Sequence, residues 1–168
     1  FEEAASQGEF VPLLVPVGVG SLAAAAARFA AARGIRVVGV EPESAACLTA
    51  ALAAGEPVPV PTPGTSMAGL DCAEVSEAAW PSLLGGVRGT VTVTDVEAAA
   101  AMRELAEAGL AIGDCGAAPL AALRALCRDP DCAELRSAVG VGTSTRALLI
   151  ATEGPTDPDS YGRALAAQ

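Results

Sequence analysis

The sequence contains neither histidine nor lysine, and these two absences narrow its chemistry more than any other feature. Without histidine there is no imidazole base, no nucleophile activated by histidine and no histidine-containing metal site. Without lysine the chain cannot itself form a Schiff base with a carbonyl compound. All ten basic residues are arginine. We therefore assign no catalytic residue to this chain.

Cysteine and basic charge are also too sparse or too scattered to form a recognisable site. The five cysteines are odd in number and form no Cys-x-x-Cys pair, which predicts no metal site and no disulfide framework. Reduced, mostly buried thiols are typical of a cytoplasmic protein. The net charge is −10 and no arginine cluster exists, which argues against nucleic acid and against anionic membranes as partners. The uncharged stretch Val11–Ala27 contains glycine and proline and follows acidic residues, so we expect neither a membrane span nor a signal segment.

An apolar run that ends in two glycines organises the first part of the chain. Leu13–Leu22 predicts a strand, a tight turn and the start of a helix. The glycines of Gly18-Val19-Gly20-Ser21 allow close approach of a ligand, and the first free amides of a helix favour a phosphate. Ser21 is expected to cap that helix. The pattern lacks the third glycine of the dinucleotide motif and the Gly-Lys-Ser/Thr of a P-loop, so an ordinary strand-to-helix turn explains it equally well.

Strands and helices alternate along the rest of the sequence. We expect strands in the opening run and at Ile35–Val40, Gly89–Thr94 and Thr145–Ala151. Helices are expected at Ser21–Arg33, Ser44–Ala54, Val75–Leu84, Asp95–Ala108, Ala118–Cys127 and Pro158–Ala167, with Asp129–Thr143 as a surface excursion. This alternation predicts one α/β domain over residues 1–168, with a parallel sheet and flanking helices.

Ligands on such sheets bind at the carboxyl ends of the strands. The segments expected there are Gly18–Ser21, Glu41–Ser44, Asp95 and Thr152–Gly154, with Gly113–Ala117 nearby. Glu41 and Glu43 are better explained as caps of the second helix than as catalytic groups, and Asp95 is expected to cap the helix that it begins. Met67, Trp80 and Cys115 are expected to pack in the core.

Five segments, in this order, resemble the fold type II pyridoxal-phosphate enzymes, and most of all those of the diaminopropionate ammonia-lyase type. They are Gly18–Ser21, Val40–Glu43 with Cys47, Met67–Glu74, Gly113–Ala117 and Thr152–Asp157. The resemblance implies a three-layer α/β/α fold and a small amino acid as substrate. It also implies that Gly18, Val19, Gly20 and Ser21 hold the phosphate of pyridoxal 5'-phosphate.

The resemblance implies roles for two further residues, with some departures from the usual pattern. Thr152 is expected beside the pyridine nitrogen, where a neutral hydroxyl suits β-elimination, and Asp114 is expected near the cofactor. Asp114-Cys115 stands where the family has Glu-Ser, and Pro155 replaces an aspartate. These changes bear on the identity of the substrate.

The Schiff-base lysine and the expected base of the family lie in an N-terminal part that this sequence does not include. We therefore expect the chain to be the C-terminal portion of a longer enzyme, homodimeric when intact and inactive alone. Another fold type II enzyme, such as a threonine or serine dehydratase, is an alternative. A non-catalytic binding module or pseudoenzyme subunit would also explain the missing lysine. A nicotinamide-dependent oxidoreductase is disfavoured because no ribose-binding acid is suitably placed after the turn.

Overall fold

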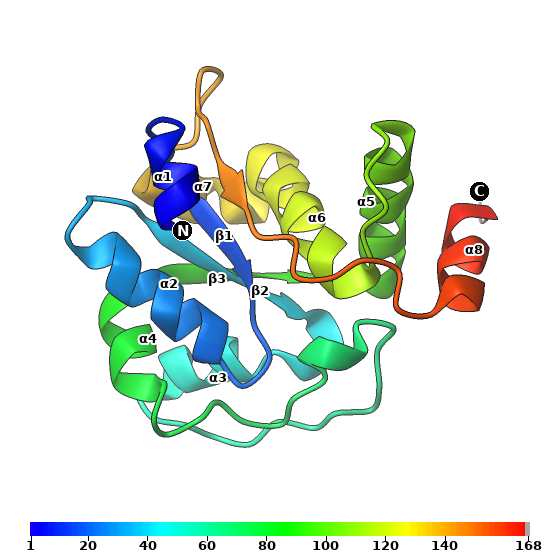
Figure 1. The fold of residues 1–168 in the computed structure, drawn as a ribbon. Helices are drawn as coiled ribbons and strands as arrows, with labels where there is room; N and C mark the ends of the chain where they lie inside the picture. Colours follow the sequence, from blue (N-terminus) through cyan, green and yellow to red (C-terminus); the bar gives the residue numbers. More distant parts are fainter. Residues whose placement is uncertain (167–168) are drawn as a thin grey trace.

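The computed structural model describes residues 1–166 as a parallel sheet covered by helices on both faces (Figure 1). Its strands are β1 (Leu13–Pro16), β2 (Val37–Pro42), β3 (Val87–Val93) and β4 (Leu148–Leu149). They lie side by side in the order β3-β2-β1-β4, and each neighbouring pair is parallel. The predicted α/β class with flanking helices is confirmed.

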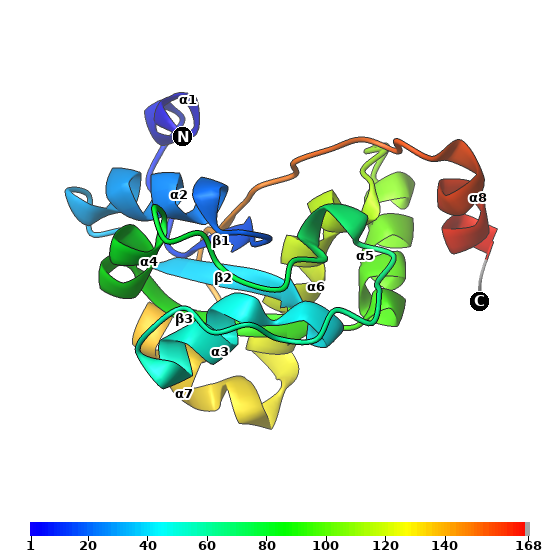
Figure 2. The same ribbon diagram turned by 90° about the horizontal axis from the view of Figure 1, so that it is seen from below.

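The helices fall into two groups around the sheet. Their bounds are α1 (Glu2–Ser6), α2 (Ser21–Ala31), α3 (Cys47–Ala54), α4 (Trp80–Gly86), α5 (Asp95–Glu107), α6 (Asp114–Arg128), α7 (Ala133–Val139) and α8 (Pro158–Ala166). Figure 1 shows α2, α3 and α4 on one side of the sheet and α6 and α7 on the other. Seen from below, α8 lies beyond α5 at one end, after a long segment that leaves β4 (Figure 2). Among the described residues, no helix is both long and apolar enough to cross a membrane.

Strand β2 is the centre of the sheet. Its residues pair with β1 from Val37 opposite Leu13 to Val40 opposite Pro16, and its other side pairs with β3. Every residue of β2 is buried, as expected for a strand covered on both faces. Because the strands are parallel, their carboxyl ends meet at one edge, and the loops that follow them can form a common site.

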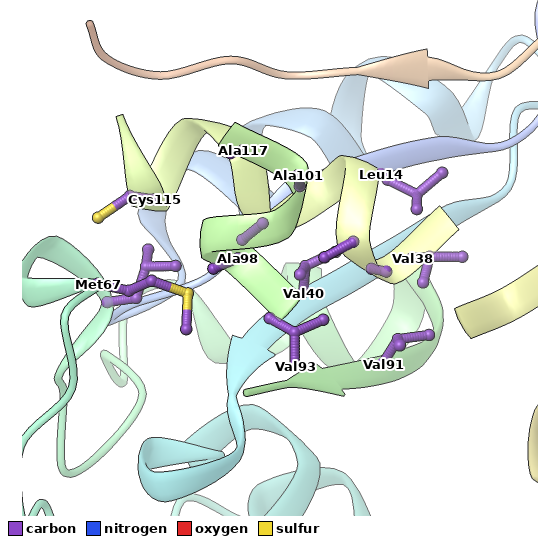
Figure 3. Close-up of a cluster of buried hydrophobic side chains, with 14 of the residues drawn as sticks. Leu14, Val38, Val40, Met67, Val91, Val93, Ala98, Ala101, Cys115 and Ala117 are labelled. Atoms are coloured by element: carbon purple, nitrogen blue, oxygen red, sulfur yellow. The ribbon is translucent and has the colours of Figure 1, made fainter. Parts of the chain in front are cut away.

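The sheet separates two hydrophobic clusters, because successive side chains of a strand point to opposite faces. Figure 3 shows part of one cluster, where Leu14, Val38 and Val40 pack with alanines of α5 and α6. Met67 and Cys115 lie at one end of this cluster, so the expectation that they are core residues is confirmed. The other cluster joins Leu13, Val15 and Val37 to α2, α3 and α4, with Trp80 packed at its margin.

The buried face of α2 consists of alanine. Its fully or nearly buried residues are Ala23, Ala24, Ala26, Ala27 and Ala30. Helix α4 approaches this face so closely that a Cβ added to Gly86 would lie 2.6 Å from the Cβ of Ala27. Small side chains thus allow α2 to pack close to its neighbours.

Several predicted boundaries were wrong, and burial explains most of the differences. Helix α6 begins at Asp114, before the predicted Ala118, because its glycine-containing first turn is buried against the sheet. The predicted strand Thr145–Ala151 is reduced to β4, an edge strand paired only with β1. Helix α7 occupies part of the predicted surface excursion. Helix α4 begins only at Trp80, and the expected final residue of the last helix, Ala167, lies outside the described residues.

The cap of α5 also differs from the prediction. Thr94, not Asp95, is the N-cap, and it forms a reciprocal capping box with Glu97. The carboxylate of Asp95 accepts hydrogen bonds from the Thr65 hydroxyl and, at 3.0 Å, from the Ser66 amide. Asp95 therefore fastens the Thr65–Cys72 segment to the carboxyl edge of the sheet.

Candidate functional site

The turn between β1 and α2 lies at the carboxyl edge of the sheet. Gly20 is the N-cap of α2 and has φ of +91°, a left-handed conformation that favours glycine. Ser21 is the first helical residue and its side chain forms no cap, so the expected capping role of Ser21 is wrong. Ser21 and Val19 are both exposed, which leaves the Ser21 hydroxyl accessible to a ligand.

The N-terminus of α2 offers hydrogen-bond donors beside this turn. Ala24 donates its amide to the Gly20 carbonyl at 2.8 Å, which begins the helical pattern. The amides that precede it have no carbonyl partner within the helix, and the helix dipole adds partial positive charge at the same end. This arrangement suits an anion such as a phosphate.

Packing behind the turn requires both of its glycines. A Cβ on Gly18 would lie 2.9 Å from the carbonyl oxygen of Gly69 and 3.0 Å from Cys72 Sγ. A Cβ on Gly20 would lie 2.6 Å from Leu83 Cδ1. The Cys47 thiol donates to the Gly18 carbonyl at 3.4 Å. Three separate segments, around Gly69–Cys72, Leu83 and Cys47, therefore hold the turn in place.

A cavity of about 300 Å³ opens in front of the turn. Its walls include the whole predicted turn, Gly18–Ser21, together with Thr152 and Glu153 from the segment after β4. The fold thus brings Thr152 to the glycine turn from a distant part of the sequence. Asp114 does not line this cavity; it lines an adjoining one of about 260 Å³, and Cys115 and Glu153 line both.

Asp114, Cys115 and Glu153 form a cluster at the N-terminus of α6. One oxygen or sulfur atom from each lies within 4.8 Å of the others. Asp114 Oδ1 accepts a hydrogen bond from the Cys115 amide at 2.9 Å. Burial, together with the negative charge of Glu153, raises the pKa of Asp114 above its ordinary value. Sequence reasoning placed Glu153 at the correct edge but gave it no role, although its position directly after Thr152 was the available signal.

Glu41 lies outside this site and has a structural role. Its carboxylate is fully buried and accepts hydrogen bonds from the amides of Leu48 at 2.6 Å and Thr49 at 2.9 Å. The Thr49 hydroxyl donates to it as well, at 2.7 Å. Burial raises the pKa of Glu41, and these hydrogen bonds oppose that rise. The expectation that Glu41 caps the second helix is confirmed, whereas Glu43 lies exposed in a short 3-10 turn.

The cysteines are expected to differ strongly in reactivity. Burial raises the pKa of the Cys47 and Cys115 thiols to about 12, whereas Cys127 is exposed. Since the thiolate is the reactive form, iodoacetamide at about pH 8 should modify Cys127 long before these two residues. Peptide mass spectrometry of timed samples would measure the rates, with urea-unfolded protein as the control. Early modification of Cys115 in the folded protein would contradict this expectation.

The chain belongs to the family described as pyridoxal-phosphate dependent enzymes, which matches residues 2–142. The residues around the turn fit the phosphate of that cofactor, because free helix amides, an exposed hydroxyl and two glycines without side chains face one cavity. Its relatives include diaminopropionate ammonia-lyase. The enzyme of that name from Salmonella typhimurium is 29% identical over 176 residues, which cover 96% of this chain and 44% of that protein.

Solved structures show the same relationship. The diaminopropionate ammonia-lyase of Escherichia coli, in complex with a reaction intermediate, superposes with a TM-score of 0.84 at 26% identity. The match covers 98% of this chain and 45% of that one. Threonine deaminase isoform 2 from Solanum lycopersicum gives a TM-score of 0.85 at 24% identity over 98% of this chain and 44% of its own, a likeness of fold. The chain therefore spans less than half the length of these relatives, and its three-layer α/β/α fold is that of fold type II enzymes.

Proposed function

We propose that this chain is the C-terminal portion of a pyridoxal-phosphate-dependent lyase that acts on 2,3-diaminopropionate or a similar amino acid. In this proposal residues 1–168 form one domain of a longer, cytoplasmic and homodimeric enzyme. The observation that carries the proposal is the meeting of Gly18–Ser21 and Thr152 around one cavity. The relatives named diaminopropionate ammonia-lyase support the choice of substrate.

Each part of this cavity has a role in the proposal. The amides at the start of α2 and the Ser21 hydroxyl donate hydrogen bonds to the phosphate. The Thr152 hydroxyl would lie beside the pyridine nitrogen and, being neutral, would leave that nitrogen unprotonated more often than a carboxylate would. Pyridoxal phosphate, when bound, supplies an electron sink for the bond broken at Cα. Asp114 borders the cofactor from the adjoining cavity.

The overall reaction converts diaminopropionate and one water into pyruvate and two molecules of ammonia. The bond from Cβ to the distal nitrogen breaks, and its electron pair leaves with the nitrogen. The chain contains no lysine, so the Schiff base and the transfer of the α-proton depend on a lysine from outside residues 1–168. The chain alone is therefore expected to be inactive.

The test begins with the coding region upstream of Phe1. If the reading frame continues into a lysine-bearing segment, the intact protein is purified and assayed for pyruvate and ammonia from diaminopropionate, serine and threonine. The proposal predicts the highest kcat/KM with diaminopropionate, and no turnover by residues 1–168 alone.

The same assay separates the two alternatives. Turnover of serine or threonine in preference to diaminopropionate would support a dehydratase, which the structural likeness to threonine deaminase permits. A start codon directly upstream of Phe1, with no lysine added, would overturn the lyase proposal and support a binding module.

A further inference from the structure

The acidic cavity beside the turn is unusual in the charges that it presents. It has a volume of about 260 Å³, and its lining includes three carboxylates, Asp114, Glu153 and Asp157, but no arginine. Hydroxyl groups complete much of the remaining polar lining, among them Ser66 and Tyr161. A small ligand that enters this cavity therefore meets negative charge and hydrogen-bond acceptors.

Two glycines hold Glu153 beside Asp114. The Gly113 amide donates to the Glu153 carbonyl at 3.2 Å. A Cβ on Gly113 would lie 2.6 Å from the Gly154 carbonyl oxygen and 3.2 Å from Glu153 Oε1. A Cβ on Gly116 would lie 3.0 Å from the Glu153 carbonyl oxygen. The segment after β4 can place the Glu153 carboxylate beside Asp114 only because Gly113 and Gly116 have no side chains.

The acidic cavity continues the cavity in front of the glycine turn. Gly69, Cys115 and Glu153 line both, and Cys115 is only 3% exposed between them. A compact amino acid that reacts in front of the turn can thus extend a short side chain toward Asp114 and Glu153. The close approach of these carboxyl groups and their partial burial disfavour two unpaired negative charges, as the raised pKa of Asp114 reflects.

We infer that Asp114 and Glu153 bind the distal ammonium group of a diamino-acid substrate and thereby select it over hydroxy amino acids. This inference rests on the proposed lyase function and gives Asp114 a contact with the substrate in addition to its place beside the cofactor. An ammonium group brings one positive charge to the two carboxylates and donates three hydrogen bonds, whereas a hydroxyl donates one and brings no charge. The loss of either carboxylate should therefore weaken binding of the diamine much more than binding of the alcohol.

The test compares diaminopropionate with serine, which carries a hydroxyl in place of the distal amine. In the intact enzyme, Asp114→Asn and Glu153→Gln keep the side-chain volume but remove the charge. Each variant is expected to lower the ratio of kcat/KM for diaminopropionate to kcat/KM for serine by about tenfold or more. The matched control is Glu74→Gln, an exposed residue outside the cavity lining, which should leave the ratio unchanged.

A second measurement does not depend on activity. Calorimetric titration of the cofactor-free intact protein with 1,2-diaminoethane and with 2-aminoethanol is expected to show tighter binding of the diamine, and Asp114→Asn should abolish that difference. If diaminopropionate is turned over but both variants keep the wild-type ratio, the inference is wrong and the lyase function stands. If the wild-type enzyme acts on serine or threonine but not on diaminopropionate, the proposed function itself fails.

Discussion

Replacing Gly18 by valine is expected to lower the affinity of the intact enzyme for pyridoxal phosphate by about a hundredfold or more. The added Cβ would lie 2.9 Å from the carbonyl oxygen of Gly69 and 3.0 Å from Cys72 Sγ, so either the turn or the Gly69 segment must move. Movement of the turn displaces the amides of α2 from the phosphate. Equilibrium dialysis followed by cofactor fluorescence would measure the change.

Gly85→Val provides the matched control for this variant. Gly85 lies in α4, and a Cβ there meets nothing within 4 Å. Valine has a higher helix propensity than glycine, so the control should not destabilise α4, and its cofactor affinity should stay within about twofold of the wild type. Equal affinities for Gly18→Val and Gly85→Val would show that the turn does not hold the phosphate.

Glu41→Leu is expected to lower the free energy of unfolding by about 2 to 4 kcal/mol. Leucine fills a similar volume but accepts no hydrogen bond, so the amides of Leu48 and Thr49 and the Thr49 hydroxyl all lose their carboxylate partner. The variant no longer buries the Glu41 carboxylate, whose removal from water is costly, and this gain offsets part of the loss. Urea unfolding at neutral pH, followed by circular dichroism, would measure the difference.

Glu43→Leu is the control for the buried carboxylate. Glu43 is exposed two residues away, and its replacement should change the free energy of unfolding by no more than about 0.5 kcal/mol. Similar losses in both variants would show that the hydrogen bonds to Glu41 contribute little net stability.

The sequence predicted those parts of the fold that depend on local pattern. The β-branched run at Val37–Val40 has no polar alternation, and only a strand buried on both faces explains it. The strand, turn and helix at Leu13–Leu22 were also predictable, since an apolar run, two glycines and an alanine-rich stretch follow one another directly. Two helix starts differed from the prediction. Helix α6 begins at Asp114 because the residues that follow are buried. Thr94 replaces Asp95 as the cap of α5 because Glu97 completes a capping box with it.

The candidate site was predictable only in part for a similar reason. Parallel strands bring their carboxyl ends to one edge, so Thr152 could be placed near Gly18–Ser21 without knowledge of distances. The contact of Glu153 with the Gly113–Gly116 segment depends on a loop path that no local pattern encodes. The acidic cavity, which depends on that contact, therefore emerged only from the structure.

The alanine face of α2 bears on the anion binding that we propose for the turn. Long side chains change rotamer and allow a helix to shift, but the buried methyl groups of Ala23, Ala27 and Ala30 have no rotamers to change. With Gly86 packed directly against Ala27, α2 has little freedom to slide or rotate. The amides at its start are thus oriented before any ligand arrives. Little entropy would therefore be lost when the turn binds the phosphate that we propose for it.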